Sequence, residues 1–437
     1  MQIVYNIRYY FMNPLLKELK ERGLIASLSG NLEELLSKPT TFYVGTDPTA
    51  DSLHLGHLLA FTTAKLLQSY GHRPIVLLGG ATAFIGDPSF KSEERKLLSA
   101  ETVEHNIEGI RKQVRKLLHF DNNDPKAAIL VNNYDWMKNF SFIDFAREVG
   151  KCITVNYMMA KDSVKKRLER EGSGMSFTEF TYQLLQGYDF VELYQNYDCK
   201  LQIGGSDQFG NGTTGIELIR KMLGKDDACM LTWPLVTKAD GTKFGKSEKG
   251  NIWLDAEKTS PYEFFQFWLN QSDEDSERYI KLFTLIPLDE IAELISKHRE
   301  NPSKRFLQRR LAEYMTDMIH GKDALDGVKQ ATAFLFGGID IKDVDENGWK
   351  FVKEEVATVQ ISKEQLSSGV TVIDLATMHD KVPSKSEARK LIKANGFSIN
   401  KEKVNDEKAV VNTDSLINDK YLLLQRGKKD YTLVIAE

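Results

Sequence analysis

The chain has 437 residues and a net charge of −4, with 41% hydrophobic and 27% charged residues. This length exceeds one ordinary hydrophobic core and predicts two or three domains. No apolar run approaches the roughly 18 residues of a membrane-spanning helix, and the N-terminus has no apolar signal core, so we expect a cytoplasmic protein. The charge balance excludes a uniformly basic surface, and any RNA contact has to come from local basic stretches.

The first pattern along the chain is a strand, a helix and a second strand. Residues 41–48 read as a strand that ends in a loop, and a helical pattern follows over 55–70. Residues 74–80 form a short apolar run that is typical of a buried parallel strand. With further strands expected at 127–132 and 200–204, this unit predicts an α/β fold on a Rossmann-like, doubly wound parallel sheet with a helical insertion.

Two histidines lie three residues apart where the first helix opens, in His54-Leu55-Gly56-His57. A first helical turn exposes unpaired N–H groups and about half a positive charge, and residues three apart project on the same side. Gly56 has no Cβ and allows a nucleotide to approach the backbone. The turn therefore predicts a phosphate site, although one capping histidine and one surface histidine would give the same pattern.

A later helix, expected to begin near Phe177 after the capping-box pair Ser176 and Glu179, carries three hydrogen-bonding side chains within an arc of about 60°. These side chains are Tyr182, Gln186 and Asp189. An exposed polar face is the alternative, but the flanking residues are apolar and aromatic and favour burial. Buried polar groups need partners, so the stripe predicts a polar ligand.

A glycine-centred loop further along, Lys243-Phe244-Gly245-Lys246-Ser247, carries two lysines. Ammonium groups on flexible stems can close over a leaving pyrophosphate. Alone, the loop would be read as a solvated turn. Together with the histidine turn far upstream, it favours a polyphosphate site.

The stretch from Tyr43 to His57 resembles the HIGH signature of class I aminoacyl-tRNA synthetases, and Lys243 to Ser247 resembles their KMSKS loop in its bacterial KFGKS form. The tyrosine-specific family is the most similar. The resemblance covers residues 13–335 and, more loosely, the C-terminal module. It implies ATP-dependent activation of L-tyrosine to tyrosyl-adenylate and transfer of tyrosine to the 3′ end of tRNA(Tyr).

The resemblance also implies roles for single residues. Groups acting on the phosphates and the leaving pyrophosphate are implied at Thr49, His54, His57, Lys243 and Lys246. Tyrosine contacts are implied at Tyr43, Asp87, Tyr182, Gln186, Asp189 and Gln208. Nucleotide contacts are implied at Gly45, Asp47, Gly56, Gly205, Asp207 and Lys246. ATP is expected as its Mg²⁺ complex, without a dedicated protein-ligated metal site.

Two positions depart from the family pattern. Val44 stands where some relatives carry a polar or sulfur side chain near the ribose, and Phe209 replaces a commonly found tryptophan after Gln208. Neither change touches a charged group. We expect altered affinity, not lost activity.

We expect four segments along the chain. A catalytic domain over 1–236 is followed by the lysine loop and an all-helical tRNA-binding domain over 237–337. Glycines and acidic residues predict a linker over 338–367, and a small α/β RNA-binding module follows over 368–437. RNA contacts are expected at Arg220 and Lys221, near the active-site loop, and at Lys385, Arg389 and Lys393 on one helix face. A solvated helix face is the alternative for each basic stretch.

The family implies a homodimer, and the apolar helices within 134–160 would be either its interface or core. Three competing functions remain open at this point. A tryptophan-specific relative shares both signatures, although Tyr43 and Asp189 favour a phenol partner. A small nucleotidyltransferase would not explain the helical domain and basic module, and intact histidines and lysines argue against a non-enzymatic RNA-binding relative.

Overall fold

The computed structural model describes residues 13–89, 97–121, 123–169, 174–247, 250–336, 338–427 and 430–437. The chain forms two compact units. The first comprises Met1–Thr259 and Phe267–Met315, and the second comprises Ser260–Gln266 and Thr316–Glu437. Within the described part of the chain, no helix combines the length and apolar character needed to cross a bilayer.

A six-stranded sheet in the order β1-β6-β5-β2-β3-β4 forms the centre of the first unit. The strands are β1 Ser27–Ser29, β2 Thr41–Thr46, β3 Arg73–Leu78, β4 Ile129–Asn132, β5 Cys199–Gly205 and β6 Cys229–Trp233. All neighbours are parallel except β1 and β6. The predicted doubly wound parallel sheet is confirmed. Its strand order reverses between β2 and β5, which is where such sheets bind ligands.

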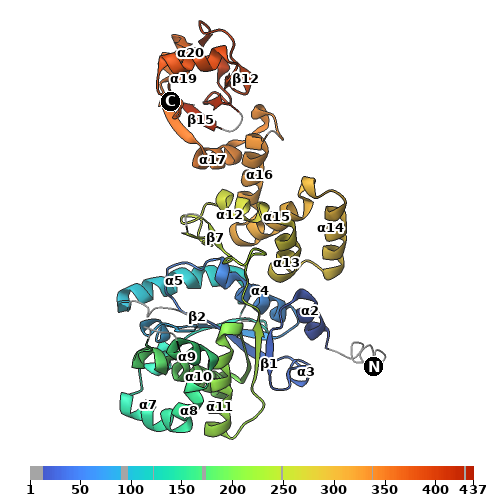
Figure 1. Cartoon of the computed structure of the whole chain (residues 1–437), viewed down its shortest axis with the longest axis vertical. Helices are drawn as coiled ribbons and strands as arrows, with labels where there is room; N and C mark the ends of the chain where they lie inside the picture. The colour runs from blue at the N-terminus through green and yellow to red at the C-terminus, as the bar shows by residue number, and fades with distance from the viewer. Residues whose placement is uncertain are drawn as a thin grey trace. The chain divides into compact units, whose positions relative to one another are not determined.

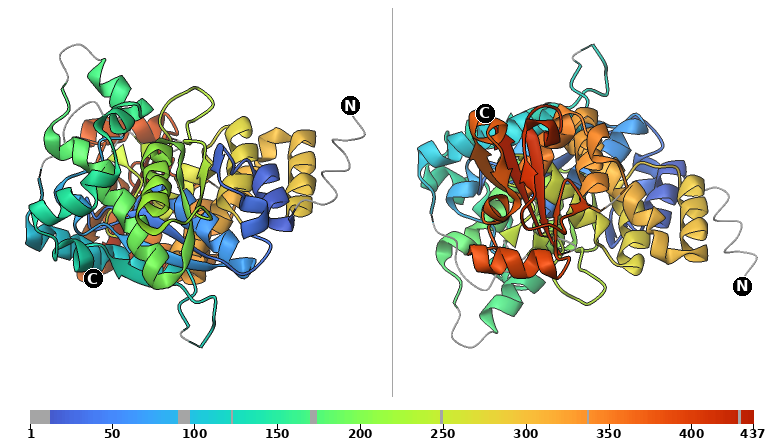
Figure 2. Two further views of the ribbon diagram at one scale, coloured as in Figure 1. Left: turned by 90° about the horizontal axis from the view of Figure 1, so that it is seen from below. Right: turned by 90° about the horizontal axis from the view of Figure 1, so that it is seen from above.

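Helices cover both faces of this sheet (Figure 1). Helices α4 (Leu55–Ser69) and α5 (Ala100–Leu117) lie on one face, and α10 (Phe177–Tyr197) and α11 (Phe209–Leu223) lie on the other. Figure 2, in its left view, shows α10 and α11 side by side. Their close approach depends on Gly187, where a Cβ would lie 3.0 Å from Leu218 Cδ1. The capping box expected from Ser176 and Glu179 is present.

Short helices occupy the chain between β4 and α10, as the expected insertion. They are α6 Tyr134–Met137, α7 Phe142–Glu148, α8 Val155–Met159 and α9 Asp162–Leu168. The N-terminal helices are α2 Pro14–Arg22 and α3 Leu32–Leu35. Arg167 in α9 is paired with Glu179 at 3.3 Å, and both side chains are buried. This pair ties the insertion to the start of α10.

A hairpin and a group of helices follow the sheet. The hairpin strands are β7 Lys246–Ser247 and β8 Gly250–Asn251, and the helices are α12 Pro261–Leu269, α13 Asp273–Phe283, α14 Leu288–Glu300 and α15 Phe306–His320. Phe244 stacks on Phe283 with ring centroids 5.0 Å apart and contacts Tyr279 at 4.8 Å. Apolar burial of Phe244 therefore anchors the loop that carries the two lysines.

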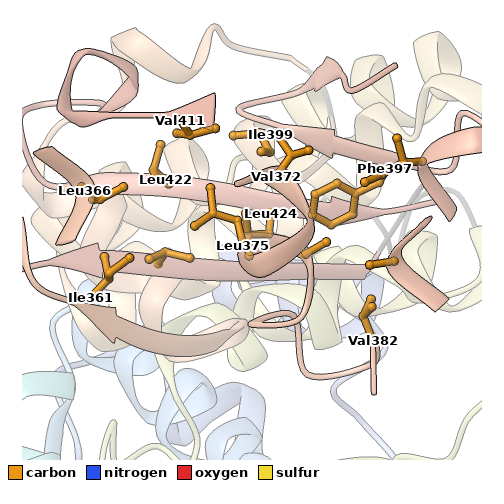
Figure 3. Packing of buried hydrophobic residues seen from close by; sticks show 14 of the residues in the cluster. Ile361, Leu366, Val372, Leu375, Val382, Phe397, Ile399, Val411, Leu422 and Leu424 are labelled. Carbon is orange, nitrogen blue, oxygen red and sulfur yellow. The ribbon is translucent and has the colours of Figure 1, made fainter. Parts of the chain in front are cut away.

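The second unit contains α16 (Lys322–Phe336), α17 (Glu346–Glu355) and a five-stranded sheet in the order β12-β11-β14-β15-β9. The strands are β9 Ala357–Ile361, β11 Phe397–Ile399, β12 Glu402–Lys403, β14 Tyr421–Arg426 and β15 Asp430–Ala436, with the last two visible in the right view of Figure 2. The remaining elements are α18 Lys363–Ser367, β10 Val370–Thr371, α19 Val372–Ala376, α20 Lys385–Lys393 and β13 Val410–Val411. Leu366, Leu375, Phe397, Leu422 and Leu424 form part of its core (Figure 3).

The expected linker over 338–367 is wrong for most of its length. Its residues form α17, β9 and α18, and β9 pairs in parallel with β15. Two of the acidic residues that suggested a linker act as caps: Asp340 accepts a hydrogen bond from the Lys342 N–H at 3.0 Å, and Asp345 accepts one from the Gly348 N–H at 2.9 Å. Trp349 is fully buried and stacks on Tyr421 at 4.6 Å. The C-terminal module therefore includes this segment.

Candidate active site

A cavity of about 750 Å³ opens at the carboxyl ends of β2 and β5, within the first unit. Every residue predicted to contact tyrosine or nucleotide, or to act on the phosphates, lines it. They are Tyr43, Gly45, Asp47, Thr49, His54, Gly56, His57, Asp87, Tyr182, Gln186, Asp189, Gly205, Asp207, Gln208, Lys243 and Lys246. The histidine turn and the lysine loop, far apart in sequence, share one cavity. Val44 also lines it, at the position that departs from the family pattern.

The two histidines form the cap of α4 and face the cavity at the same time. His54 Nδ1 accepts a hydrogen bond from the Gly56 N–H at 3.0 Å, and His57 Nδ1 accepts one from the His54 N–H at 3.3 Å. The imidazole rings stack with centroids 3.9 Å apart. Because both Nδ1 atoms accept, the ring proton of each neutral imidazole lies on Nε2. Each ring is therefore an Nε2–H donor beside a helix N-terminus.

Gly56 has a structural reason that the sequence did not show. A Cβ at this position would lie 2.7 Å from Cε1 of His54. The folded-back imidazole of His54 therefore occupies the space on the Cβ side of Gly56. Any side chain at position 56 would displace that ring from its capping bond.

Asp189 and Tyr43 form a polar part of the cavity wall, and both side chains are buried. The Asp189 carboxylate accepts hydrogen bonds from Asn133 Nδ2 at 3.1 Å and from Trp136 Nε1 at 2.9 Å. Burial raises the pKa of Asp189 to about 8, while these two hydrogen bonds act in the opposite direction. Burial and then the nearby Asp189 raise the pKa of Tyr43 well above its usual value. The Tyr43 hydroxyl is buried and has no partner among the described residues.

A second polar cluster lies around Asp47. Its carboxylate accepts hydrogen bonds from the Tyr182 hydroxyl at 2.9 Å and from Thr82 Oγ1 at 2.8 Å. Thr82 Oγ1 also accepts a bond from Asn133 Nδ2 at 3.1 Å. Asn133 therefore connects the Asp47 cluster with Asp189.

A third cluster holds the remaining predicted tyrosine contacts. Gln208 Nε2 donates to Asp87 at 2.9 Å, and Asn211 Nδ2 donates to Gln186 Oε1 at 2.9 Å. The Asp87 carboxylate also accepts the Ser89 N–H at 3.0 Å. These bonds hold the Gln186 and Asp87 oxygens at the cavity wall.

Four residues of these networks were missed by the sequence reasoning. They are Thr82, Asn133, Trp136 and Asn211. Asn133 directly follows a predicted strand, and polar residues after parallel strands meet at the ligand-binding edge, so this signal was available. Thr82 and Asn211 carry no comparable signal, because a lone hydroxyl or amide in a helical turn is ordinary.

The basic residues expected to contact RNA lie outside the cavity. Arg220 and Lys221 lie in the last turn of α11, about 17 Å along the helix from its first residue. Both are paired with Glu217, at 2.7 Å and 3.3 Å. In the second unit, Lys385, Arg389 and Lys393 are exposed on α20, with Lys385 paired to Asp374 at 2.6 Å.

The doubly wound sheet with both signatures at one cavity defines an enzyme that handles a nucleotide and a small polar substrate. Residues 36–337 match the family described as tRNA synthetases class I (W and Y), and residues 350–434 match the Tyrosine--tRNA ligase SYY-like C-terminal domain. The chain belongs to the class I tRNA synthetase family for tryptophan and tyrosine.

Similarity to whole proteins identifies which of the two amino acids the chain uses. The tyrosine--tRNA ligases of Porphyromonas gingivalis and Flavobacterium johnsoniae are 54% and 52% identical to the chain, over 96% and 97% of it and 99% of each relative. A C-terminally truncated Aspergillus nidulans mitochondrial tyrosyl-tRNA synthetase matches with a TM-score of 0.67 at 31% identity, covering 77% of this chain and 98% of that one. The activity of the chain is that of a tyrosine--tRNA ligase, which uses ATP, and the tryptophan-specific alternative is set aside.

Proposed function

We propose that the cavity binds tyrosine and ATP side by side, with tyrosine along the β2–α10 wall. The Tyr43 hydroxyl and the Asp189 carboxylate hold the substrate phenol. The Tyr43 hydroxyl is buried without a partner among the described residues, and the Asp189 carboxylate can accept a further hydrogen bond. Asp87, Tyr182 and Gln186 hold the ammonium group, and Gln208 contacts the substrate near its carboxyl group. A cation bound among these carboxylates also favours the ionised form of Asp189.

The phosphates of ATP are placed between the two signatures. The Nε2–H donors of His54 and His57, with the Thr49 hydroxyl, contact the phosphates, and Lys243 and Lys246 neutralise the leaving pyrophosphate. Gly45, Asp47, Gly56, Gly205 and Asp207 contact the nucleoside, with Asp207 on the ribose. ATP arrives as its Mg²⁺ complex, whose cation is held by the phosphates and water.

The reaction needs no nucleophilic side chain. An oxygen of the tyrosine carboxylate attacks the α-phosphorus of ATP, the bond to the β-phosphate oxygen breaks, and pyrophosphate leaves with that electron pair. The terminal ribose hydroxyl of tRNA(Tyr) then attacks the tyrosyl carbonyl, and AMP leaves. The chain contributes positioning and charge stabilisation.

The observation that carries these roles is the shared cavity of the histidine turn and the lysine loop. We test it by tyrosine-dependent exchange of labelled pyrophosphate into ATP, with tryptophan as the substrate control. The variant His57→Asn is expected to lower kcat about 100-fold, with the KM for tyrosine unchanged. His119→Asn, an exposed histidine paired with Asp124 at 3.2 Å, is the matched control. Normal exchange by His57→Asn would rule out the assigned phosphate role.

The tRNA-binding assignments are proposals of the same kind. The helices over 237–337 and the module over 368–437, with Lys385, Arg389 and Lys393 on α20, provide the RNA-binding surface. Arg220 and Lys221 are secondary candidates because Glu217 engages both. The protein would act in the cytoplasm, where tRNA and ATP are both available.

We also propose a homodimer formed through the helical insertion. Large apolar side chains are exposed in the insertion and at the start of α10: Phe142 at 72%, Ile143 at 74%, Val155 at 59% and Phe177 at 67% exposure. Phe142 and Phe177 face each other with ring centroids 6.3 Å apart. Contiguous exposed apolar surface marks an interaction site. Light scattering on Ile143→Asp should show a monomer, and an unchanged dimer would place the interface elsewhere.

A further inference from the structure

Trp253 contacts the histidine turn directly, and its neighbour Ile252 bonds to the lysine loop. Its indole meets the His54 imidazole edge-on, with ring centroids 5.8 Å apart. His54 and Trp253 also form an antiparallel β-bridge. Trp253 does not line the cavity, so it cannot act on the substrates by contact. We propose that Trp253 is a positioning residue, which holds the His54 imidazole in the orientation needed for the phosphates. This inference rests on the proposed role of His54.

The backbone around Trp253 is attached to the histidine turn on both sides. The Leu55 N–H donates to Ile252 O at 3.0 Å, and the Leu254 N–H donates to Leu53 O at 2.8 Å. The same segment returns to the lysine loop, because the Ile252 N–H donates to Gly245 O at 3.0 Å. The three bonds form a short ladder between the loop and the start of α4. Residues 252–254 therefore fix the spacing between the lysines and the histidines.

The His54 ring is held between two other rings. His57 stacks on one side at 3.9 Å and the indole edge of Trp253 stands on another at 5.8 Å. The capping bond from the Gly56 N–H fixes Nδ1, and the tilt of the ring about that bond is limited by the neighbouring rings. The indole blocks that tilt, so it determines where the Nε2–H of His54 points.

The indole is itself held in place from its outer side. The backbone N–H of Trp253 donates to Thr259 Oγ1 at 3.0 Å and fixes the main chain that carries the ring. Lys258 Nζ lies 5.7 Å from the indole centroid and is paired with Asp51 at 2.9 Å. Asp51 lies in the loop that leads to the histidine turn. The ring thus sits between Lys258 and His54, in a position that its own loop and that of the histidines determine together.

A residue with a purely structural role would have its side chain in the core. In this segment the core side chains belong to the neighbours of Trp253. Ile252 and Leu254 are 1% and 6% exposed, while Trp253 is half-buried between them. Apolar anchoring of the segment therefore depends on Ile252 and Leu254. Replacing the indole should leave the segment attached and the fold intact.

The test is a double-mutant cycle on the full chain. Trp253→Leu and His54→Asn are made singly and together, with Trp253→Phe as the conservative variant, and pyrophosphate exchange gives kcat and both KM values. We expect Trp253→Leu to lower kcat about 10-fold with the KM for tyrosine unchanged, and Trp253→Phe to recover most of it. In the His54→Asn background, Trp253→Leu should lower kcat less than twofold further, because the imidazole that the indole positions is already absent.

The cycle separates this inference from the proposed function. If His54→Asn alone leaves exchange intact, the phosphate role of His54 is wrong and the coupling fails with it. If His54→Asn is impaired but Trp253→Leu is normal, or the two losses multiply, only the coupling is wrong. Trp253→Met replaces Trp253→Leu if thermal unfolding shows that the leucine variant does not fold.

Discussion

At the scale of single residues, the polar cavity wall is a set of groups fixed by one another. Asn133 donates to both Asp189 and Thr82, and Thr82 donates to Asp47, so one buried amide orients both carboxylates. Gly79 permits this arrangement, because a Cβ there would lie 2.1 Å from Asp47 Oδ1. Binding a substrate that leaves preorganised buried groups of this kind unpaired therefore costs free energy.

Discrimination between tyrosine and phenylalanine should depend on Asp189 and not on His54. Phenylalanine leaves the buried groups at the phenol end unpaired, which costs about 1–3 kcal/mol per group. Asp189→Ala removes one of these groups and should reduce the preference for tyrosine by at least 10-fold. His54→Ala should lower activation of both amino acids equally. Exchange assays with each amino acid measure the ratio, and equal discrimination by the two variants would refute the assignment.

The buried carboxyl also predicts a dependence of stability on pH. The pKa of Asp189 is raised from its usual 3.8 to about 8, so folding favours the protonated form. Such a group stabilises the fold below its unfolded pKa, and this contribution is lost as the pH rises to the folded value. Thermal unfolding should show the wild-type chain losing stability relative to Asp189→Asn between about pH 4 and about pH 8. A difference that is the same at every pH would contradict the raised pKa.

At the scale of elements, the turns that join strands to helices place the site. Helix α4 begins at the histidine turn because His54 caps it, and α5 passes close to the loop that precedes this turn. Gly109 in α5 makes that passage possible, since a Cβ there would lie 1.9 Å from the backbone oxygen of Asp51. A glycine in the middle of a helix is thus explained by its neighbour and not by helix propensity.

Gly109→Ala should destabilise the chain although alanine favours helix. The clash is with backbone, which cannot move aside cheaply, so overpacking of about 1–3 kcal/mol outweighs a propensity gain of about 1 kcal/mol. Gly210→Ala in the first turn of α11 is the control, because its Cβ would meet Lys161 Cδ at an ordinary 3.7 Å. Denaturant unfolding of both variants measures the effect. Equal stability of the two would show that α5 can shift away from the loop.

At the scale of the whole molecule, the two units contain different sets of proposed functional residues. The first contains the complete cavity, and the second contains the module with the basic face of α20. On the proposed assignments, we expect amino-acid activation to require only groups of the first unit and tRNA binding to draw on both.

Replacing Lys385, Arg389 and Lys393 by alanine should separate these two activities. Loss of phosphate contacts should weaken tRNA(Tyr) binding and reduce its salt dependence by roughly one unit of slope per lost contact. Pyrophosphate exchange should be unchanged, because these residues are on α20 and do not line the cavity. Lys342→Ala, an exposed lysine elsewhere in the second unit, is the control. Unchanged tRNA binding by the triple variant would move the RNA surface away from α20.

Local patterns in the sequence predicted the doubly wound sheet, the cap of α10, the histidine turn, the polar stripe of α10 and the lysine loop, because apolar periodicity, capping pairs and glycine-bounded signatures are properties of neighbouring residues. The roles of the other cavity-lining residues were implied by the family resemblance, and their assignments remain predictions. The packing of the elements brought Asn133, Trp136 and Thr82 into the polar networks of the site, placed the Trp253 ring against His54, and joined the expected linker to the C-terminal sheet. Such contacts join residues distant in sequence, and their formation depends on how the elements pack together.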